Sequence, residues 1–175
     1  MRRLALLALV VVTGCGDDAP QNKAAAAGPT ALAPGQWELT SEVTRFSQSD
    51  HGAPRINTPV GTRTTANICV GAGAQQPTAF YSGDNFNCTY GTYYARNGMI
   101  NLTLQCTRPG LTGQIPMTID GTFQGSTIDY HRNLRTVLST DGDVEIDAHV
   151  TGRRTGDCTP AATPAAAPAA AGRRH

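Results

Sequence analysis

The chain has 175 residues, enough for one ordinary domain with additional segments at both ends. Its 14 Lys and Arg residues nearly balance its 13 Asp and Glu residues, so nucleic acid is not expected as a partner. Gly, Pro and Thr are plentiful and long helical periodicity is missing, which favours an all-β domain with many turns.

Residues 1–14 have the features of a bacterial secretory leader. Arg2 and Arg3 supply the positive charge, and nine consecutive apolar residues follow from Leu4 to Val12. Nine helical residues rise about 13 Å, which is less than half of the roughly 30 Å hydrocarbon core of a bilayer. We therefore expect this run to be a signal peptide and not a membrane-spanning helix.

The leader ends in Val12-Thr13-Gly14-Cys15, which resembles a bacterial lipobox: an aliphatic residue, two small residues and a cysteine. In lipoproteins of this kind the cysteine thiol receives a diacylglycerol and the leader is cut before it. We therefore predict that Cys15 is lipidated and that this lipid anchors the chain to a membrane. Gly16 follows the cysteine, which favours the outer membrane over the inner, so we expect a cell-envelope lipoprotein that faces the periplasm.

Two low-complexity segments flank the expected domain. Residues 15–34 are rich in Ala and Pro and predict a flexible tether. Residues 159–175 space prolines through alanine and predict a disordered tail. The region between them, 35–158, shows the alternation that is typical of β-strands and is predicted to be the β domain.

Alternating residues predict the strands and their inward faces. The first strand turns Trp37, Leu39, Ser41 and Val43 to one face, and a weaker strand lies near Arg63–Val70. The later inward sets are Phe86, Cys88, Tyr90, Thr92 and Tyr94; Ile100, Leu102, Leu104 and Cys106; Met117, Ile119, Gly121 and Phe123; Ile128 and Tyr130; Leu134, Thr136 and Leu138; and Val144, Ile146, Ala148 and Val150.

The even or odd numbering of the inward residues predicts the register of the hairpin formed by residues 86–94 and 100–106. Its two inward sets both occupy even positions, so facing residues must have an even sum. A two-residue turn Asn97-Gly98 would put the two sets on opposite faces, whereas a three-residue loop Arg96-Asn97-Gly98 puts them on the same face. That loop places Tyr94 opposite Ile100, and it places Cys88 opposite Cys106, which predicts a disulfide.

The same argument predicts two further hairpins. A two-residue turn Gln124-Gly125 supplies the odd sum that Phe123 and Ile128 require, and a three-residue loop Thr140-Asp141-Gly142 pairs Leu138 with Val144. Successive hairpins predict an antiparallel up-and-down meander of about seven or eight strands. A sheet of this size curls, so we expect it to close as a small barrel or a two-layer sandwich.

Five cysteines occur in the chain, and pairing Cys88 with Cys106 leaves Cys69 and Cys158 besides Cys15. An exported domain lies in an oxidising compartment, so Cys69 and Cys158 are expected to pair by elimination. No C-x-x-C motif occurs, which argues against a thioredoxin-like redox role and against a zinc knuckle.

Short motifs near the two ends of the domain resemble a known family. Pro34-Gly35-Gln36-Trp37-Glu38 opens the domain, a cysteine follows the second strand, and Gly152-Arg153-Arg154-Thr155-Gly156-Asp157-Cys158 closes it. These motifs resemble domain-of-unknown-function family 3617, whose members are small exported or lipid-anchored envelope proteins of Gram-negative bacteria. Members often carry an aromatic residue where Arg154 stands. The resemblance implies an exported, β-rich, disulfide-stapled protein and implies no particular activity.

One row of acidic residues is the best candidate for a metal site. Asp143, Glu145, Asp147 and His149 alternate along one strand face, where such residues lie about 6.7 Å apart. Oxygens around one cation lie much closer together, so we expect a solvated outer face and no metal site. The predicted register places Asp147 opposite Arg135 as an exposed ion pair.

No catalytic set emerges from the remaining polar residues. His131 and His149 are expected to lie diagonally across the last hairpin, and Asp50-His51 lies in a loop without an identifiable nucleophile. No cofactor is predicted. An enzyme of unfamiliar type that uses His131 and His149, or the row from Asp143 to Asp147, is the alternative hypothesis.

Six aromatic residues are predicted to point inward: Trp37, Phe86, Tyr90, Tyr94, Phe123 and Tyr130. They form either an ordinary core or the lining of a ligand cavity, because an eight-stranded barrel can enclose one small molecule. The leading hypothesis is a non-enzymatic, lipid-anchored periplasmic β-domain. It would serve as a binding or envelope-maintenance module for a small apolar ligand or an envelope protein.

Overall fold

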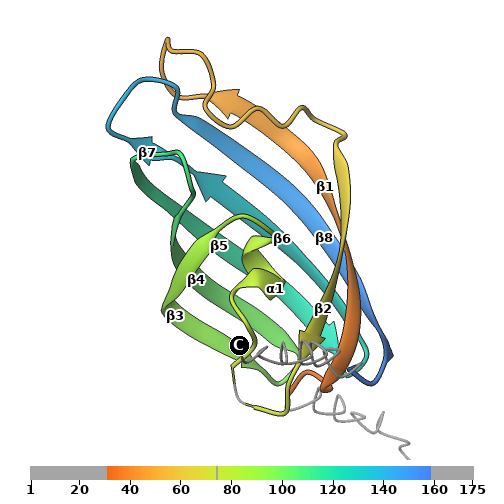
Figure 1. Cartoon of the computed structure of the whole chain (residues 1–175). Coiled ribbons are helices and arrows are strands. Elements are labelled where there is room, and N and C mark those ends of the chain that lie inside the picture. Colours follow the sequence, from red (N-terminus) through yellow and green to blue (C-terminus); the bar gives the residue numbers. More distant parts are fainter. Residues whose placement is uncertain (1–30, 74, 159–175) are drawn as a thin grey trace, which may run out of the picture.

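The computed structural model describes residues 31–73 and 75–158, which form an antiparallel β-sheet and one helical turn (Figure 1). The strands are β1 (Gly35–Gln48), β2 (Arg63–Val70), β3 (Asn87–Arg96), β4 (Met99–Thr107), β5 (Gly113–Gln124), β6 (Thr127–Arg135), β7 (Val137–Leu138) and β8 (Val144–Gly156), and the helix is α1 (Ala79–Ser82). No helix in this part of the chain is long and apolar enough to cross a membrane.

The sheet curls into a half-barrel, with the strand order β2-β1-β8-β6-β5-β4-β3 (Figure 1). The two-residue strand β7 lies off this path and pairs with β5. The all-β antiparallel meander predicted from the sequence is therefore confirmed. Within the described residues no ladder joins the edge strands β2 and β3, so the curl does not close into a hydrogen-bonded barrel. The helical turn α1 lies on the concave side, where Phe80 and Tyr81 are fully buried.

Strand β1 turns its apolar residues inward as predicted. Trp37 is fully buried, its indole N–H donates to the Ala33 carbonyl at 3.0 Å, and its ring meets the Phe80 ring edge-on at 5.7 Å. Leu32, which composition assigned to the tether, is also buried in the core. The packed part of the chain therefore begins before Gly35.

The register of the β3–β4 hairpin corrects one prediction. Cys88 faces Cys106 as expected, but Tyr94 faces Asn101 and not Ile100. The turn is Asn97-Gly98, the two-residue alternative that the parity argument rejected. Both residues have positive φ (55° and 75°), which is the geometry of a tight type I′ turn.

A β-bulge at Gly91 reconciles the tight turn with the inward cysteines. The register shifts by one residue between Tyr90 and Thr92, so the strand changes phase midway. A Cβ atom at Gly91 would lie 2.7 Å from the Thr103 hydroxyl oxygen, and that oxygen accepts a hydrogen bond from the Thr92 N–H at 2.9 Å. Tyr93 therefore packs against the core in place of Tyr94.

The other two predicted hairpins are right in parity and wrong in detail. The β5–β6 turn is Gly125-Ser126, one residue later than predicted, and it does pair Phe123 with Ile128. The predicted pairing of Leu138 with Val144 is wrong, because the chain leaves the β6–β8 ladder after Arg135 and Leu138 pairs with Gly113 on β5.

Both expected disulfides are present. Cys88 and Cys106 bridge the directly opposed positions of β3 and β4, with a Cα–Cα distance of 4.1 Å. The bond between Cys69 and Cys158 joins the end of β2 to the chain two residues after β8, with a Cα–Cα distance of 5.4 Å. The predicted leader, the lipidation site Cys15, most of the tether and the tail at 159–175 lie outside the described residues.

Candidate functional site

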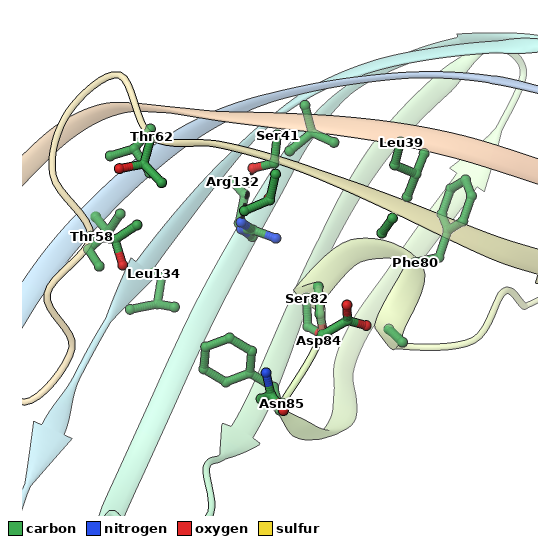
Figure 2. Close-up of a pocket in the computed structure, with 18 of the residues that line it drawn as sticks. Leu39, Ser41, Thr58, Thr62, Phe80, Ser82, Asp84, Asn85, Arg132 and Leu134 are labelled. Atoms are coloured by element: carbon green, nitrogen blue, oxygen red, sulfur yellow. Dashed lines mark hydrogen bonds between the residues drawn. The ribbon is translucent and has the colours of Figure 1, made fainter.

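A pocket of about 330 Å³ lies on the concave side of the sheet, beside α1 and strands β1, β2 and β6 (Figure 2). Its buried apolar lining consists of Leu39, Val43, Ile56, Phe80, Tyr130, Leu134, Ile146 and Val150. Its more exposed lining residues are polar and include Thr58, Thr62, Thr64, Asp84 and Asn85. The arrangement is therefore an apolar floor beneath a polar opening.

Arg132 on β6 is one of the charged residues that line this pocket. It occupies the inward phase of its strand, in the same alternation as the buried residues Ile128, Tyr130 and Leu134. Figure 2 shows its guanidinium group directed into the pocket near Ser41. A charged side chain on the concave face of a small β-sheet is unusual, because burial of an ion requires compensation.

The contacts of Arg132 are with neutral acceptors. Its Nη1 donates to the Tyr81 carbonyl at 3.1 Å, and its Nη2 donates to the Ser41 hydroxyl at 3.3 Å. Among residues 31–73 and 75–158, no carboxylate forms an ion pair with it. Desolvation by burial lowers the pKa of Arg132 from its usual value.

Two further charged residues line the same pocket. Arg108 is partly buried, and its guanidinium carbon lies 5.4 Å from the centre of the Phe86 ring. Asp84 is exposed and follows α1 by two residues. The pocket therefore holds two cations and one anion, and its net charge is positive.

Tyrosine hydroxyls hold the helical turn in place. Tyr130 donates to the Phe80 carbonyl at 2.9 Å, and Tyr90 donates to the Gln76 carbonyl at 2.8 Å. Burial raises the pKa of Tyr81, Tyr90 and Tyr130 above the usual value of a phenol. These groups therefore stay protonated at neutral pH, where they act as hydrogen-bond donors and not as bases.

The six aromatic candidates for a cavity lining have different positions. Phe86 and Tyr130 line the pocket, Trp37 and Phe123 are buried in the core, and Tyr90 packs beside it. Tyr94 is the exception, because the bulge at Gly91 turns it away from the core. Arg96 stacks on the Tyr94 ring at 4.7 Å.

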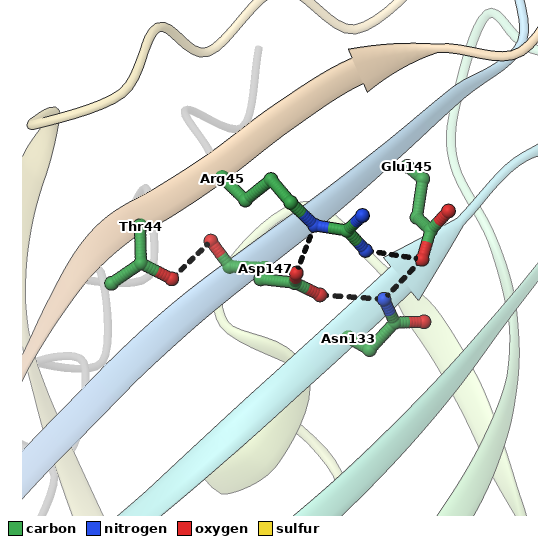
Figure 3. Close-up of polar contacts among 5 residues, drawn as sticks. All are labelled: Thr44, Arg45, Asn133, Glu145 and Asp147. Atoms are coloured by element: carbon green, nitrogen blue, oxygen red, sulfur yellow. Dashed lines mark hydrogen bonds and ion pairs between the residues drawn. The ribbon is translucent and has the colours of Figure 1, made fainter.

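The acidic row on β8 is paired with an arginine that the sequence did not suggest. Figure 3 shows Arg45 of β1 between Glu145 and Asp147, at 2.7 Å and 2.5 Å. Asn133 donates to both carboxylates, at 2.9 Å and 2.6 Å. The predicted pairing of Asp147 with Arg135 is wrong, because the observed register places Asn133 opposite Asp147.

Hydrogen bonding also decides the charge state of Asp147. Burial alone would raise its pKa, but the hydrogen bonds from Arg45 and Asn133 outweigh burial and lower it. The carboxylate is thus held ionised. Within the described residues, no group of three or more His, Cys, Asp or Glu side chains is arranged to hold a metal ion.

The two histidines face each other directly and not diagonally. His131 pairs with His149, and their rings stack at 4.9 Å between centroids. His149 contacts Asp129 at 2.9 Å. A second, more open depression of about 310 Å³ lies beside His131 and is also lined by Asp147.

Asp50, beside His51 in the sequence, supports a loop. Its carboxylate accepts hydrogen bonds from the backbone N–H groups of Gly142, at 2.8 Å, and Asp143, at 2.9 Å. These backbone hydrogen bonds, from Asp143 and Gly142 in that order, lower the pKa of Asp50. The carboxylate therefore ties the loop after β1 to the loop before β8.

Sequence reasoning missed Arg132, the residue that distinguishes the pocket. The signal was present, because Arg132 has the parity of Ile128, Tyr130 and Leu134. Charged residues generally lie on the protein surface, so the inward position of Arg132 was not predicted. Its two partners come from β1 and from α1, which no pairing argument within the last hairpin could supply.

Comparison with known proteins identifies the family. Residues 32–158, most of the chain, match the family described as "Protein of unknown function (DUF3617)". Searches of curated proteins and of solved structures each found no match. The match covers all the strands and both disulfides, including the pocket on the concave side. The chain therefore belongs to the DUF3617 family.

Proposed function

We propose that this protein is a lipid-anchored lipoprotein of the Gram-negative envelope whose β domain binds a small apolar ligand in the concave pocket. The observation that carries the proposal is the pocket of about 330 Å³ with its buried apolar floor. Small-molecule sites are typically clefts of about 300–1,000 Å³ lined by apolar side chains with a few polar groups. A lipid anchor at Cys15 would hold this pocket close to a membrane.

The polar groups of the pocket favour binding over catalysis. Arg132 is a permanent cation, and the Tyr130 hydroxyl stays protonated and is already hydrogen-bonded to the Phe80 carbonyl. Such groups orient a ligand but do not abstract its proton. On the opposite face, Arg45 and Asn133 already engage Glu145 and Asp147, the carboxylates that an enzyme there would use.

Thr64→Trp is expected to weaken ligand binding by filling the pocket. Thr64 lies opposite Ser41 in the β1–β2 ladder, so it shares the concave face, yet it is exposed and tolerates a larger side chain. We expect the affinity for the neutral fluorophore N-phenylnaphthylamine to fall by about tenfold or more, which corresponds to about 1.4 kcal/mol. Fluorescence titration measures this change.

Thr40→Trp is the matched control. Thr40 is exposed on the outward phase of β1, so the same substitution there adds bulk to the opposite face of the sheet. We expect it to leave the affinity unchanged. Native mass spectrometry of protein purified from its own envelope provides a second readout. A protein that binds no fluorophore and carries no co-purified small molecule would contradict the proposal.

Cys15→Ser is expected to release the protein from the membrane fraction. A serine hydroxyl at this position cannot take the place of the thiol that receives the diacylglycerol. Metabolic labelling with palmitate and membrane fractionation measure the effect, and we expect both signals to disappear. Thr13→Ser keeps a small residue in the lipobox and should label normally. A Cys15→Ser protein that still incorporates palmitate would refute the anchor.

A further inference from the structure

The position of Arg132 sets a requirement on whatever fills the pocket. The side chain lies on the concave face among apolar residues, and its described hydrogen bonds go to the Tyr81 carbonyl and the Ser41 hydroxyl only. Arg132 is partly buried, and neutral acceptors compensate such a cation poorly, because an unpaired charge costs more in a partly desolvated site than in water. An anionic group of the ligand would supply the missing compensation.

The geometry of the guanidinium leaves room for such a group. Arginine carries five N–H donors in a planar fork, and two of them are used in the described contacts. The remaining donors can engage a carboxylate or a phosphate through charge-assisted hydrogen bonds. The Ser41 hydroxyl accepts from Arg132, so its own hydrogen is free to be donated to the same anion.

The other charged residues of the pocket also favour an anionic ligand. Arg108 lines the pocket and adds a second positive charge, whereas Asp84 is exposed and forms no ion pair with either arginine among the described residues. Beyond the guanidinium the floor of the pocket is apolar, with Leu39, Val43 and Leu134 all buried. Anion recognition and an apolar floor therefore meet in one pocket.

We propose that Arg132 recognises the anionic head group of the ligand, and that the ligand class is a single-chain amphiphile with a carboxylate or phosphate head. This inference rests on the proposed function of the concave pocket. It names the polar end of the ligand, which a purely apolar site would not require. The chain of the amphiphile lies on the apolar floor, and the head group lies beside the Arg132–Ser41 pair, where it can accept hydrogen bonds from both.

Arg132 also has a structural contact that the test must separate from recognition. Its hydrogen bond to the Tyr81 carbonyl helps to hold α1 against the sheet. A purely structural arginine would affect all ligands of the pocket equally when it is replaced. A recognition residue would affect anionic ligands and spare neutral ones of the same shape.

Isothermal titration with decanoate and decanamide makes this separation, since the two molecules differ mainly in the charge of the head group. We expect the wild-type protein to prefer decanoate by about tenfold to about a hundredfold, the range of charge-assisted hydrogen bonds. Arg132→Met should abolish this preference and leave the affinity for decanamide within about twofold. Arg135→Met is the matched control, because Arg135 lies on the same strand, is exposed and faces outward; it should keep the preference.

The possible outcomes distinguish a failure of the role of Arg132 from a failure of the proposed function. Equal binding of both compounds to wild type and to Arg132→Met would overturn the role of Arg132 while the apolar pocket stands. Binding of neither compound would overturn the proposed function as well. Should Arg132→Met fail to fold, Arg132→Lys keeps the charge but loses the planar fork, and we expect a reduced preference for decanoate; an unchanged preference would count against head-group recognition by the fork.

Phosphate ligands test the amphiphile itself. We expect decyl phosphate to bind with an affinity similar to that of decanoate and inorganic phosphate to bind at least about tenfold more weakly, because it gains nothing from the apolar floor. Equal affinities of inorganic and decyl phosphate would show a plain anion site and would overturn the ligand class.

Discussion

Replacing Cys69 and Cys158 together by alanine is expected to lower the free energy of unfolding by about 4.5 kcal/mol. The disulfide closes a loop with a sequence separation of 89 residues, so its loss returns much conformational freedom to the unfolded chain. In the folded protein the bond ties the edge strand β2 to the residues after β8. Urea unfolding in the absence of reductant measures the change.

The double variant Cys88→Ala/Cys106→Ala is the comparison for this prediction. This bond has a sequence separation of 18 residues, and it joins strands that are already hydrogen-bonded to each other. Loop-closure entropy then gives a smaller loss of about 3 kcal/mol. Equal losses, or a larger loss for the inner pair, would show that native-state contacts and not chain entropy set the contribution of the two bonds.

Trp37→Ala is expected to destabilise the protein by about 4 kcal/mol, the middle of the range for a large core aromatic. The indole is fully buried, packs edge-on against Phe80 and donates to the Ala33 carbonyl. Its removal leaves a cavity beneath α1 and frees the segment that precedes β1. Urea unfolding followed by far-ultraviolet circular dichroism provides the measurement, because the variant loses the intrinsic tryptophan signal.

Trp37→Phe separates packing from hydrogen bonding at the same position. Phenylalanine keeps an aromatic ring against Phe80 but cannot donate to Ala33, so we expect a loss of about 1–2 kcal/mol. Trp37 belongs to the core and does not line the pocket. The affinity for N-phenylnaphthylamine should therefore stay within about twofold of wild type, and a large loss of affinity would contradict this assignment.

Local alternation predicted much of the fold. The inward sets of β1, β4 and β5 appear in the structure as written in the sequence, and β2 spans the predicted Arg63–Val70. The Cys88–Cys106 disulfide followed from the inward phase of the two cysteines, and the Cys69–Cys158 disulfide followed by elimination. These features depend on neighbours a few residues apart, which a period of two captures well.

Parity could not locate the irregularities. An even sum at Cys88 and Cys106 is satisfied either by a three-residue loop or by a tight turn combined with a bulge, and local alternation does not distinguish the two. The chain uses the second, with Asn97-Gly98 in the turn and Gly91 at the bulge. The same limit explains Tyr93 and Tyr94, whose faces exchange beyond the bulge.

The pocket depends on contacts between distant segments. Arg132 meets residues from β1 and α1, and Arg45 reaches carboxylates on β8 that lie about a hundred positions later, because β1 inserts beside β8. Hairpin reasoning connects only successive strands, so it could not place β1. A charged residue in an inward phase was the one local clue, and the general preference of arginine for the surface concealed it.

Within the part of the chain that the structure describes, the two edges of the sheet are not hydrogen-bonded to each other, and this affects how the width of the interior is set. A closed barrel fixes its bore by strand number and stagger, because every strand is hydrogen-bonded on both sides. Here β2 and β3 are not joined, and Phe80 and Tyr81 of the connecting segment occupy the interior between them. Sequence changes confined to residues 75–86 can therefore widen or narrow the interior while every strand pair keeps its register. The volume of the interior can thus change during evolution without a change in the strand pairing of the fold.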